Sequence, residues 1–112
     1  VYSIVLSSQL DAENQVRSGM TGSDTDAISR NVISDAGYGE NFGHSLGHGV
    51  GLAVHESPRI SSNEDILKKN MIITIEPGLY FNGIGGIRIE NTFKVNDENI
   101  SSLSNIDYII SL

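Results

Sequence analysis

The three histidines of this chain, His44, His48 and His55, fall within twelve consecutive positions. Imidazole nitrogens bind divalent metals and move protons, so the cluster marks a candidate site. Each glycine inside a helix costs about 0.8–1 kcal/mol relative to alanine. Extended or looped backbone is therefore favoured over a helical i, i+4 zinc pair. Glycines recur through this segment at Gly43, Gly47, Gly49 and Gly51.

The same cluster has a structural explanation. Glycine allows backbones to approach closely, and histidine can cap a loop or form hydrogen bonds in the core. For a single histidine that explanation is the better one, but three in one segment favour a functional site. In a strand, His48 and His55 would face opposite sides unless the chain bends, and Gly49 and Gly51 are where a bend could lie.

Two glutamates belong to the same candidate site. Glu76 ends an apolar segment before Pro77-Gly78, and Glu90 lies in a segment of alternating apolar and polar residues. If these segments pair as a hairpin, the carboxylates approach on one face and repel unless they share a cation or proton. With His48 nearby, two carboxylates and one imidazole would bind a divalent ion such as Mn²⁺.

Arg88 shares the face of Glu90, two residues away, and could orient that carboxylate. The spacing equally allows an ordinary ion pair between Arg88 and Glu90, with Glu76 as a solvated charge at a strand end. The spacing alone leaves both interpretations open.

Two helices are expected ahead of these residues. Apolar residues at helical spacing predict an amphipathic helix over residues 2–17, and a second is expected over about 24–35. Ser23 and Asp26 resemble a capping box for the second helix. The expected buried residues of the first are Tyr2, Val5, Leu6, Leu10 and Val16. Those of the second are Ile28, Val32, Ile33 and Ala36.

An antiparallel sheet is expected to follow, which makes the fold class α+β. Residues 71–76 predict a largely buried strand, and residues 87–95 alternate strictly, as half-buried strands do. Asn82-Gly83 and Gly85-Gly86 mark the turn between them. A last strand is expected at about 108–112, after a polar loop over 96–105. The apolar side of the second strand consists of Ile87, Ile89, Phe93 and Val95.

Composition limits the remaining possibilities. The 112 residues, 38% of them hydrophobic, suit a single small domain. Seven Lys and Arg against 14 Asp and Glu give a net charge of −7, with the basic residues scattered, which argues against a nucleic-acid partner. No apolar run approaches the roughly 18 residues of a membrane-spanning helix, so no membrane partner is expected. Without cysteine, metal ligands must be nitrogen or oxygen.

Three motifs in order resemble those of the Xaa-Pro peptidases, the proline-directed aminopeptidases and dipeptidases (prolidases) among the pita-bread metallopeptidases. They are the histidine-containing run 43–58, Thr74-Ile75-Glu76-Pro77-Gly78-Leu79-Tyr80, and Gly85-Gly86-Ile87-Arg88-Ile89-Glu90-Asn91. The approach at residues 19–30 also resembles the family's helix-loop-helix. The resemblance covers nearly the whole chain. It implies half of a pita-bread fold, two N-terminal helices followed by a curved antiparallel sheet.

The resemblance also implies a metal centre. His48 matches the histidine ligand of a dinuclear site, Glu76 a carboxylate ligand near the attacking water, and Glu90 the carboxylate that bridges both metals. The implied cofactors are two divalent ions, Mn²⁺ first, with Co²⁺ or Zn²⁺ as alternatives. Such a pair activates water to hydrolyse an Xaa-Pro bond at the N-terminus of a peptide or in a dipeptide.

Three further residues gain substrate roles from the resemblance. His55 matches the histidine that contacts the substrate carbonyl and stabilises the tetrahedral intermediate, a catalytic role that it shares with Glu76. His44 matches a residue beside the substrate proline, and Arg88 one that forms hydrogen bonds around the site. The implied partner is a peptide with proline at its second position.

One departure from the family pattern concerns two aspartate ligands, which have no counterpart in residues 1–112, so three of the family's five ligands are present. Because the chain begins at Val1 without an initiator Met, we expect residues 1–112 to be the C-terminal part of a catalytic domain. We expect weak or no metal binding, and no activity of this part alone. The alternatives are an inactive pita-bread module that binds peptides or proteins and, less favoured, an unrelated metal-binding domain. Cytoplasmic location and a homo-oligomer, formed through an exposed apolar sheet face, are also expected.

Overall fold

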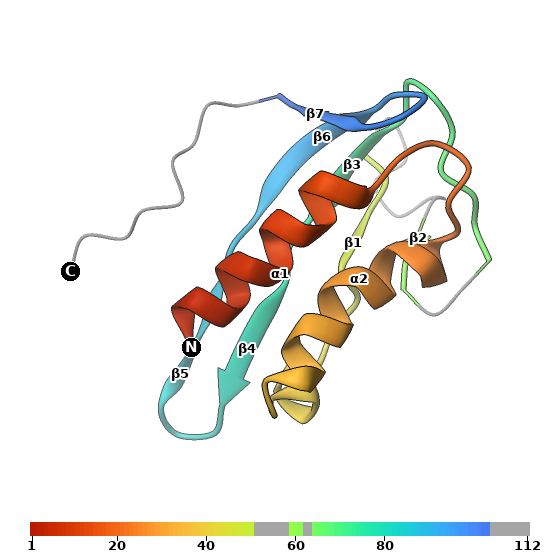
Figure 1. Cartoon of the computed structure of the whole chain (residues 1–112). Coiled ribbons are helices and arrows are strands. Elements are labelled where there is room, and N and C mark those ends of the chain that lie inside the picture. Colours follow the sequence, from red (N-terminus) through yellow and green to blue (C-terminus); the bar gives the residue numbers. More distant parts are fainter. Residues whose placement is uncertain (51–58, 62–63, 104–112) are drawn as a thin grey trace.

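Two helices cover one face of a group of antiparallel strands (Figure 1). The structure is a computed structural model, and it describes residues 1–50, 59–61 and 64–103. The helical elements are α1 (Tyr2–Gln15), α2 (Gly22–Asp35) and the short 3-10 helix η1 (Gly39–Asn41). The strands are β1 (Gly47–His48), β2 (Arg59–Ile60), β3 (Ile72–Ile75), β4 (Gly78–Phe81), β5 (Gly85–Arg88), β6 (Asn91–Val95) and β7 (Ile100–Ser102). The α+β order and both helices are as predicted.

The strands from β3 to β6 form one long antiparallel ribbon. β3 pairs with β6, with Ile75 opposite Asn91, and β4 pairs with β5, with Gly78 opposite Arg88. The same register holds on both sides of Pro77, whose missing N–H interrupts the ladder between the two pairs. The predicted hairpin is therefore confirmed, and its two halves are held in step over the whole length.

β1 lies antiparallel beside β3, on the edge away from β6. The Val50 N–H donates to the Ile72 carbonyl at 2.8 Å, and the Glu76 N–H donates to the Leu46 carbonyl at 2.7 Å. β2 pairs with the other edge of β1, and β7 pairs with the free edge of β6. The described part of the histidine-containing segment is thus extended at β1, as its glycines predict.

The core lies between the helices and the sheet. Ile33 from α2 and Val5 and Ala12 from α1 pack in one cluster with the strand residues, and each is fully buried. The alternation predicted for residues 87–95 is confirmed at the buried Phe93 and Val95. The sheet residues of the core include Ile73, Ile75, Leu79, Ile89, Phe93 and Val95.

The predicted buried sides of the helices are partly wrong. Leu10 is 42% exposed and Ala36 is exposed, although both were expected inside. The reason is that small polar residues form the contact between the helices. Ser8 and Ser29 are fully buried, and the Ser29 hydroxyl donates to the Ser8 carbonyl at 2.7 Å. A satisfied serine lets two helices approach closely, and this turns the larger apolar residues outward.

The capping box of α2 is also displaced from its predicted position. Thr21 is the N-cap: its hydroxyl oxygen accepts from the Asp24 N–H at 3.0 Å, and its own N–H donates to the Asp24 carboxylate at 3.5 Å. The Ser23 and Asp26 prediction is wrong because the helix begins at Gly22, two residues earlier than expected. Asp26 is left free for the interior contacts described below.

The C-terminal strand differs from the prediction as well. β7 lies within the segment expected to be a polar loop, because the Asn96 N–H donates to the Asn99 carbonyl at 2.8 Å and turns the chain back along β6. The strand predicted at 108–112 lies outside the described residues.

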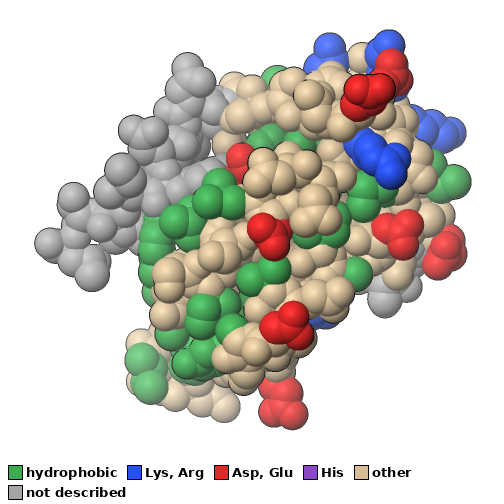
Figure 2. All heavy atoms as spheres, in the orientation of Figure 1, with side chains coloured by type: hydrophobic (Ala, Val, Ile, Leu, Met, Phe, Trp, Pro, Cys, Tyr) green, Lys and Arg blue, Asp and Glu red, His purple; other side chains and the backbone are tan. Residues whose placement is uncertain are grey.

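The two faces of the sheet differ in character. The helix-covered side carries dispersed acidic side chains, with Lys and Arg gathered at one end and no histidine of the described residues in view (Figure 2). Residues that alternate with the core on β3 and β6 are mostly polar, Thr74, Thr92 and Lys94 among them. Neither α1 nor α2, the α-helices of the described chain, has the length and apolarity for a membrane crossing.

Candidate metal centre

His48 and Glu76 meet on the face of the sheet away from the helices. The His48 N–H donates to the Thr74 hydroxyl at 3.1 Å, which fixes β1 against β3. Glu76 is two residues beyond Thr74, and side chains two apart in a strand share a face. The His48 Nε2 and a Glu76 carboxylate oxygen are 3.9 Å apart. The structure therefore brings together two of the three predicted metal ligands.

The hydrogen bonds of His48 define which nitrogen faces Glu76. Nδ1 lies 2.9 Å from the Gly49 carbonyl oxygen, and a carbonyl only accepts, so Nδ1 carries the hydrogen. In the neutral ring, Nε2 then directs a lone pair toward a carboxylate, an arrangement that a shared cation or proton stabilises. Metal-binding histidines usually donate their second ring nitrogen in this way. The donor set fits a divalent cation.

Solvent reaches this pair. The His48 side chain is 39% exposed and that of Glu76 is 18% exposed. A site of this kind can exchange a metal ion and admit water or a ligand. Complete burial would instead have favoured a structural role for the histidine.

The register of the ribbon sets Glu90 opposite Glu76, but the structure does not bring its carboxylate together with His48 and Glu76. Ile75 is opposite Asn91, so the next position in the antiparallel ladder sets Glu90 opposite Glu76. Its carboxylate is 3.5 Å from Arg88 Nη2, and both side chains are about half exposed. No three His, Cys, Asp or Glu side chains in the described parts of the chain gather closely enough to hold a metal together. Both earlier interpretations of Arg88 remain compatible with this ion pair.

His44 is held apart from this pair. Its Nδ1 donates to the Ser45 carbonyl at 2.7 Å, and its Nε2 is 3.0 Å from the Tyr80 hydroxyl. The ring packs edge-on against Phe42, with centroids 5.1 Å apart. Tyr80 thus joins the predicted residue His44 from β4, a contact that the sequence spacing did not indicate. His55 lies outside the described residues.

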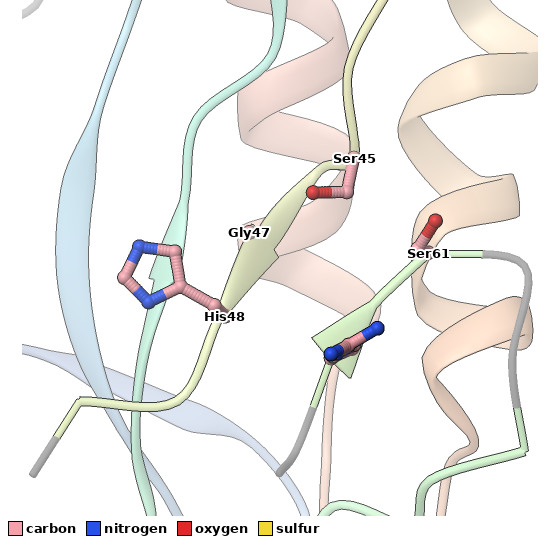
Figure 3. A pocket seen from close by; sticks show the side chains of 5 residues that line it. Ser45, Gly47, His48 and Ser61 are labelled. Atoms are coloured by element: carbon pink, nitrogen blue, oxygen red, sulfur yellow. The ribbon is translucent and has the colours of Figure 1, made fainter. Parts of the chain in front are cut away.

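A pocket opens beside His48. Its volume is about 330 Å³, and Figure 3 shows Gly47 and His48 along β1, with Ser45 before them and Ser61 just after β2. Arg59 completes the lining and supplies a positive charge. Hydroxyl and guanidinium donors next to a candidate metal ligand suit a polar or anionic part of a ligand.

Gly47 sets the spacing between β1 and β3. A Cβ at this position would lie 1.9 Å from the Thr74 carbonyl oxygen, so only glycine allows the strands to approach this closely. Sequence reasoning identified the glycine but missed Thr74 as its partner. The available signal was a single hydroxyl residue, Thr74, within the apolar run Ile72-Ile73-Thr74-Ile75.

Comparison with known proteins agrees with this arrangement. Residues 1–97 match the model of metallopeptidase family M24. The chain is 52% identical over 96 residues to an Xaa-Pro dipeptidase of Pyrococcus horikoshii, a match that covers 85% of this chain and 27% of that protein. An Xaa-Pro dipeptidase of Pyrococcus furiosus is 48% identical over 105 residues, covering 93% of this chain and 30% of the relative.

Solved structures show the same fold. The prolidase from Pyrococcus furiosus superimposes with a TM-score of 0.91 at 45% identity, covering 96% of this chain and 32% of that one. An X-Pro aminopeptidase from Thermotoga maritima gives a TM-score of 0.91 at 44% identity, covering 97% and 31%. The chain spans less than a third of the length of each of these relatives.

The fold is that of the pita-bread metallopeptidases. The match to the family model extends from Val1 to Asp97, most of the chain, and includes His48, Glu76 and Glu90. The chain belongs to metallopeptidase family M24.

Proposed function

We propose that His48, Glu76 and Glu90 bind divalent metal for hydrolysis of an Xaa-Pro peptide bond. The observation that carries the proposal is the 3.9 Å approach of His48 Nε2 to Glu76, with Nδ1 bonded to the Gly49 carbonyl. Bound metal, Mn²⁺ or alternatively Co²⁺ or Zn²⁺, would lower the pKa of a coordinated water and polarise the scissile carbonyl. That the site holds two metal ions is also part of this proposal.

Each of the other nominated residues has a task in this reaction. His44, bonded to Tyr80, borders the substrate proline, and Arg88 orients Glu90 through its ion pair. His55 stabilises the tetrahedral intermediate by donating to the developing oxyanion. The names of the relatives, Xaa-Pro dipeptidase and X-Pro aminopeptidase, support a substrate with proline in second position.

We propose further that residues 1–112 form the C-terminal part of the catalytic domain, and that two aspartate ligands come from outside these residues. The proposal is supported by the fraction of the relatives that the chain spans, 27% and 30% for the two dipeptidases. The chain on its own is then expected to bind metal weakly and to be inactive. A homo-oligomer and a cytoplasmic location stay predictions.

Metal binding can be tested on the chain by NMR during titration with Mn²⁺. Paramagnetic broadening reports even weak binding, and we expect it to centre on the amides of His48, Glu76 and Glu90. Changing Glu76→Gln should abolish the centred broadening, because an amide does not replace a carboxylate ligand for a hard cation. The matched control, Glu98→Gln on an exposed turn, should leave it unchanged. Broadening that persists unchanged in the Glu76→Gln variant would contradict the proposal.

The reaction can be tested in the protein as it is expressed from its own gene. We expect Mn²⁺-dependent hydrolysis of an Xaa-Pro dipeptide, little hydrolysis of the matching Xaa-Ala dipeptide, and loss of activity in Glu90→Gln. An inactive peptide-binding module would instead retain peptide affinity without any metal-dependent turnover. That outcome would overturn the enzymatic proposal.

A further inference from the structure

Asp26 is a buried acid on α2, away from the metal centre. It is 6% exposed, and both of its oxygens accept hydrogen bonds. One oxygen accepts from Arg30 Nε at 2.7 Å, and the other from Arg30 Nη2 at 3.2 Å. The second oxygen also accepts from the Leu46 N–H at 3.1 Å, in a segment twenty residues further along the chain. The carboxylate thus connects the helix to the residues that precede β1.

Arg30 holds the same segment at two other points. Its Nη1 donates to the Phe42 carbonyl at 3.0 Å, and its Nη2 donates to the His44 carbonyl at 2.9 Å. The guanidinium also lies over the Phe42 ring, 4.1 Å from the centroid. A planar guanidinium can bond a carboxylate on one edge and two carbonyls on another, which a lysine cannot do. Residues 42–46 are therefore fixed at both ends from α2.

The fixed segment leads directly into the candidate ligands. The Leu46 N–H donates both to the Asp26 carboxylate at 3.1 Å and to the Ile60 carbonyl at 2.9 Å. The carbonyl of Leu46 accepts from the Glu76 N–H at 2.7 Å, and His48 follows two residues later. A shift of Leu46 would consequently move both nominated ligands relative to each other.

We propose that Asp26 and Arg30 are positioning residues that set the separation of His48 and Glu76, an inference that rests on the proposed function. They touch neither ligand side chain and act through the backbone of residues 42–46. Metal ligands need placement within a few tenths of an ångström, and supporting bonds of this kind tune metal affinity. The alternative is that the pair only stabilises the loop.

The test compares Asp26→Asn and Arg30→Lys with a matched surface change. Asn keeps the shape of the acid and Lys keeps the positive charge, but each loses part of the fork of hydrogen bonds. Asp97→Asn is the control, because it makes the same chemical change in an exposed ion pair with Lys69, 3.3 Å long. Thermal unfolding of each variant identifies those that are folded at the temperature of measurement. If Asp26→Asn does not fold, Arg30→Lys decides the question.

The main readout is the Mn²⁺ affinity of the folded variants, each made in the protein as it is expressed from its own gene, where the full ligand set is proposed to be present. We expect it to fall by about 10–100-fold in Asp26→Asn and Arg30→Lys, as for other supporting contacts of metal ligands, and to stay unchanged in Asp97→Asn. Unchanged affinity in a folded Arg30→Lys variant would overturn the positioning role, because loop stabilisation alone predicts that result.

A second readout separates this inference from the proposed function. Without metal, the imidazole NMR signals of His48 and the hydrogen exchange of the Glu76 amide should change in Arg30→Lys but not in Asp97→Asn. If the unaltered protein expressed from its own gene shows no Mn²⁺ effect at His48, the metal proposal fails, and these metal-free signals still decide the positioning role. Signals identical to those of the unaltered chain would reject it.

Discussion

His48 makes close contacts through three of its polar atoms, although its side chain is 39% exposed. Its N–H bonds to Thr74, its Nδ1 to the Gly49 carbonyl, and its Nε2 faces Glu76. The Nδ1 contact is with the carbonyl of the next residue, Gly49, so the ring orientation is tied to the local backbone. A ligand ordered in this way loses little rotational freedom when it binds a cation.

Replacing Thr74→Val tests the contact that joins the two strands at this point. Valine has the shape of threonine but cannot accept the His48 N–H, so a backbone donor loses its partner. We expect the free energy of unfolding to fall by about 1–3 kcal/mol in urea denaturation, the usual cost of an unsatisfied buried group. Thr92→Val, on the neighbouring strand, should change stability far less. Equal effects would show that β-sheet context, and not this bond, matters.

Part of the site could be predicted from the residues alone. The alternation of residues 87–95 and the turn glycines predict the face and the strand of Glu90, and Pro77-Gly78 marks the strand end at Glu76. The contacts of Tyr80 with His44 and of Asp26 with Leu46 could not be predicted, because they join residues far apart in sequence. Such contacts depend on tertiary packing, which a single sequence does not encode in any local period.

At the scale of elements, the closeness of β1 to β3 determines whether a histidine and a glutamate can share a ligand. The strands approach because Gly47 has no side chain, and because the Leu46 carbonyl bonds the Glu76 N–H at 2.7 Å. The helices contribute through the Ser29–Ser8 hydrogen bond, which joins α2 to α1, and through Asp26, which joins α2 to Leu46. The presence of both helices was predictable here, whereas the start of α2 and the buried faces were not, since serine gives no hydrophobic signal.

A methyl group at position 47 should separate the strands. In Gly47→Ala the Cβ would meet the Thr74 carbonyl oxygen at 1.9 Å, and neither can rotate away, because the oxygen belongs to the backbone and the Cβ is fixed directly to Cα. We expect a loss of about 1–3 kcal/mol in the free energy of unfolding, the usual range for overpacking, together with weaker Mn²⁺ broadening. Gly43→Ala is the control, because nothing lies within 4 Å of a Cβ there. Comparable losses in both variants would contradict the close-approach explanation.

For the whole molecule, one core supports both the helix layer and the ribbon that carries the glutamates. Fully or nearly fully buried side chains from α1, α2 and the strands belong to one cluster, and Phe93 is among the largest of them. The general α+β order followed from periodicity. The short β7 and the difference between the polar and the helix-covered faces could not be predicted from periodicity, because both depend on how the strands pair in three dimensions.

Truncating Phe93→Ala should destabilise the entire chain. Removing a buried aromatic ring costs about 3–5 kcal/mol through lost burial and an unfilled cavity. We expect a fall of that size in the free energy of unfolding, measured by urea denaturation with two optical probes. Ile84→Ala, at the β4–β5 turn where the side chain is 87% exposed, should change it by less than about 0.5 kcal/mol. Similar losses of unfolding free energy in Phe93→Ala and Ile84→Ala would contradict a single shared core.

Because the register of the ribbon is the same on both sides of Pro77, the number of residues between successive paired positions within each strand cannot change without altering the pairing. Losing or gaining one codon between Ile87 and Phe93 would rotate part of β5 and β6 by half a turn, exchanging the carboxylate of Glu90 with a core side chain. Changes at Asn82-Gly83-Ile84 leave both strands in place. Insertions and deletions should therefore collect at that turn in descendants of this gene, and the turn is the natural place to attach a reporter peptide.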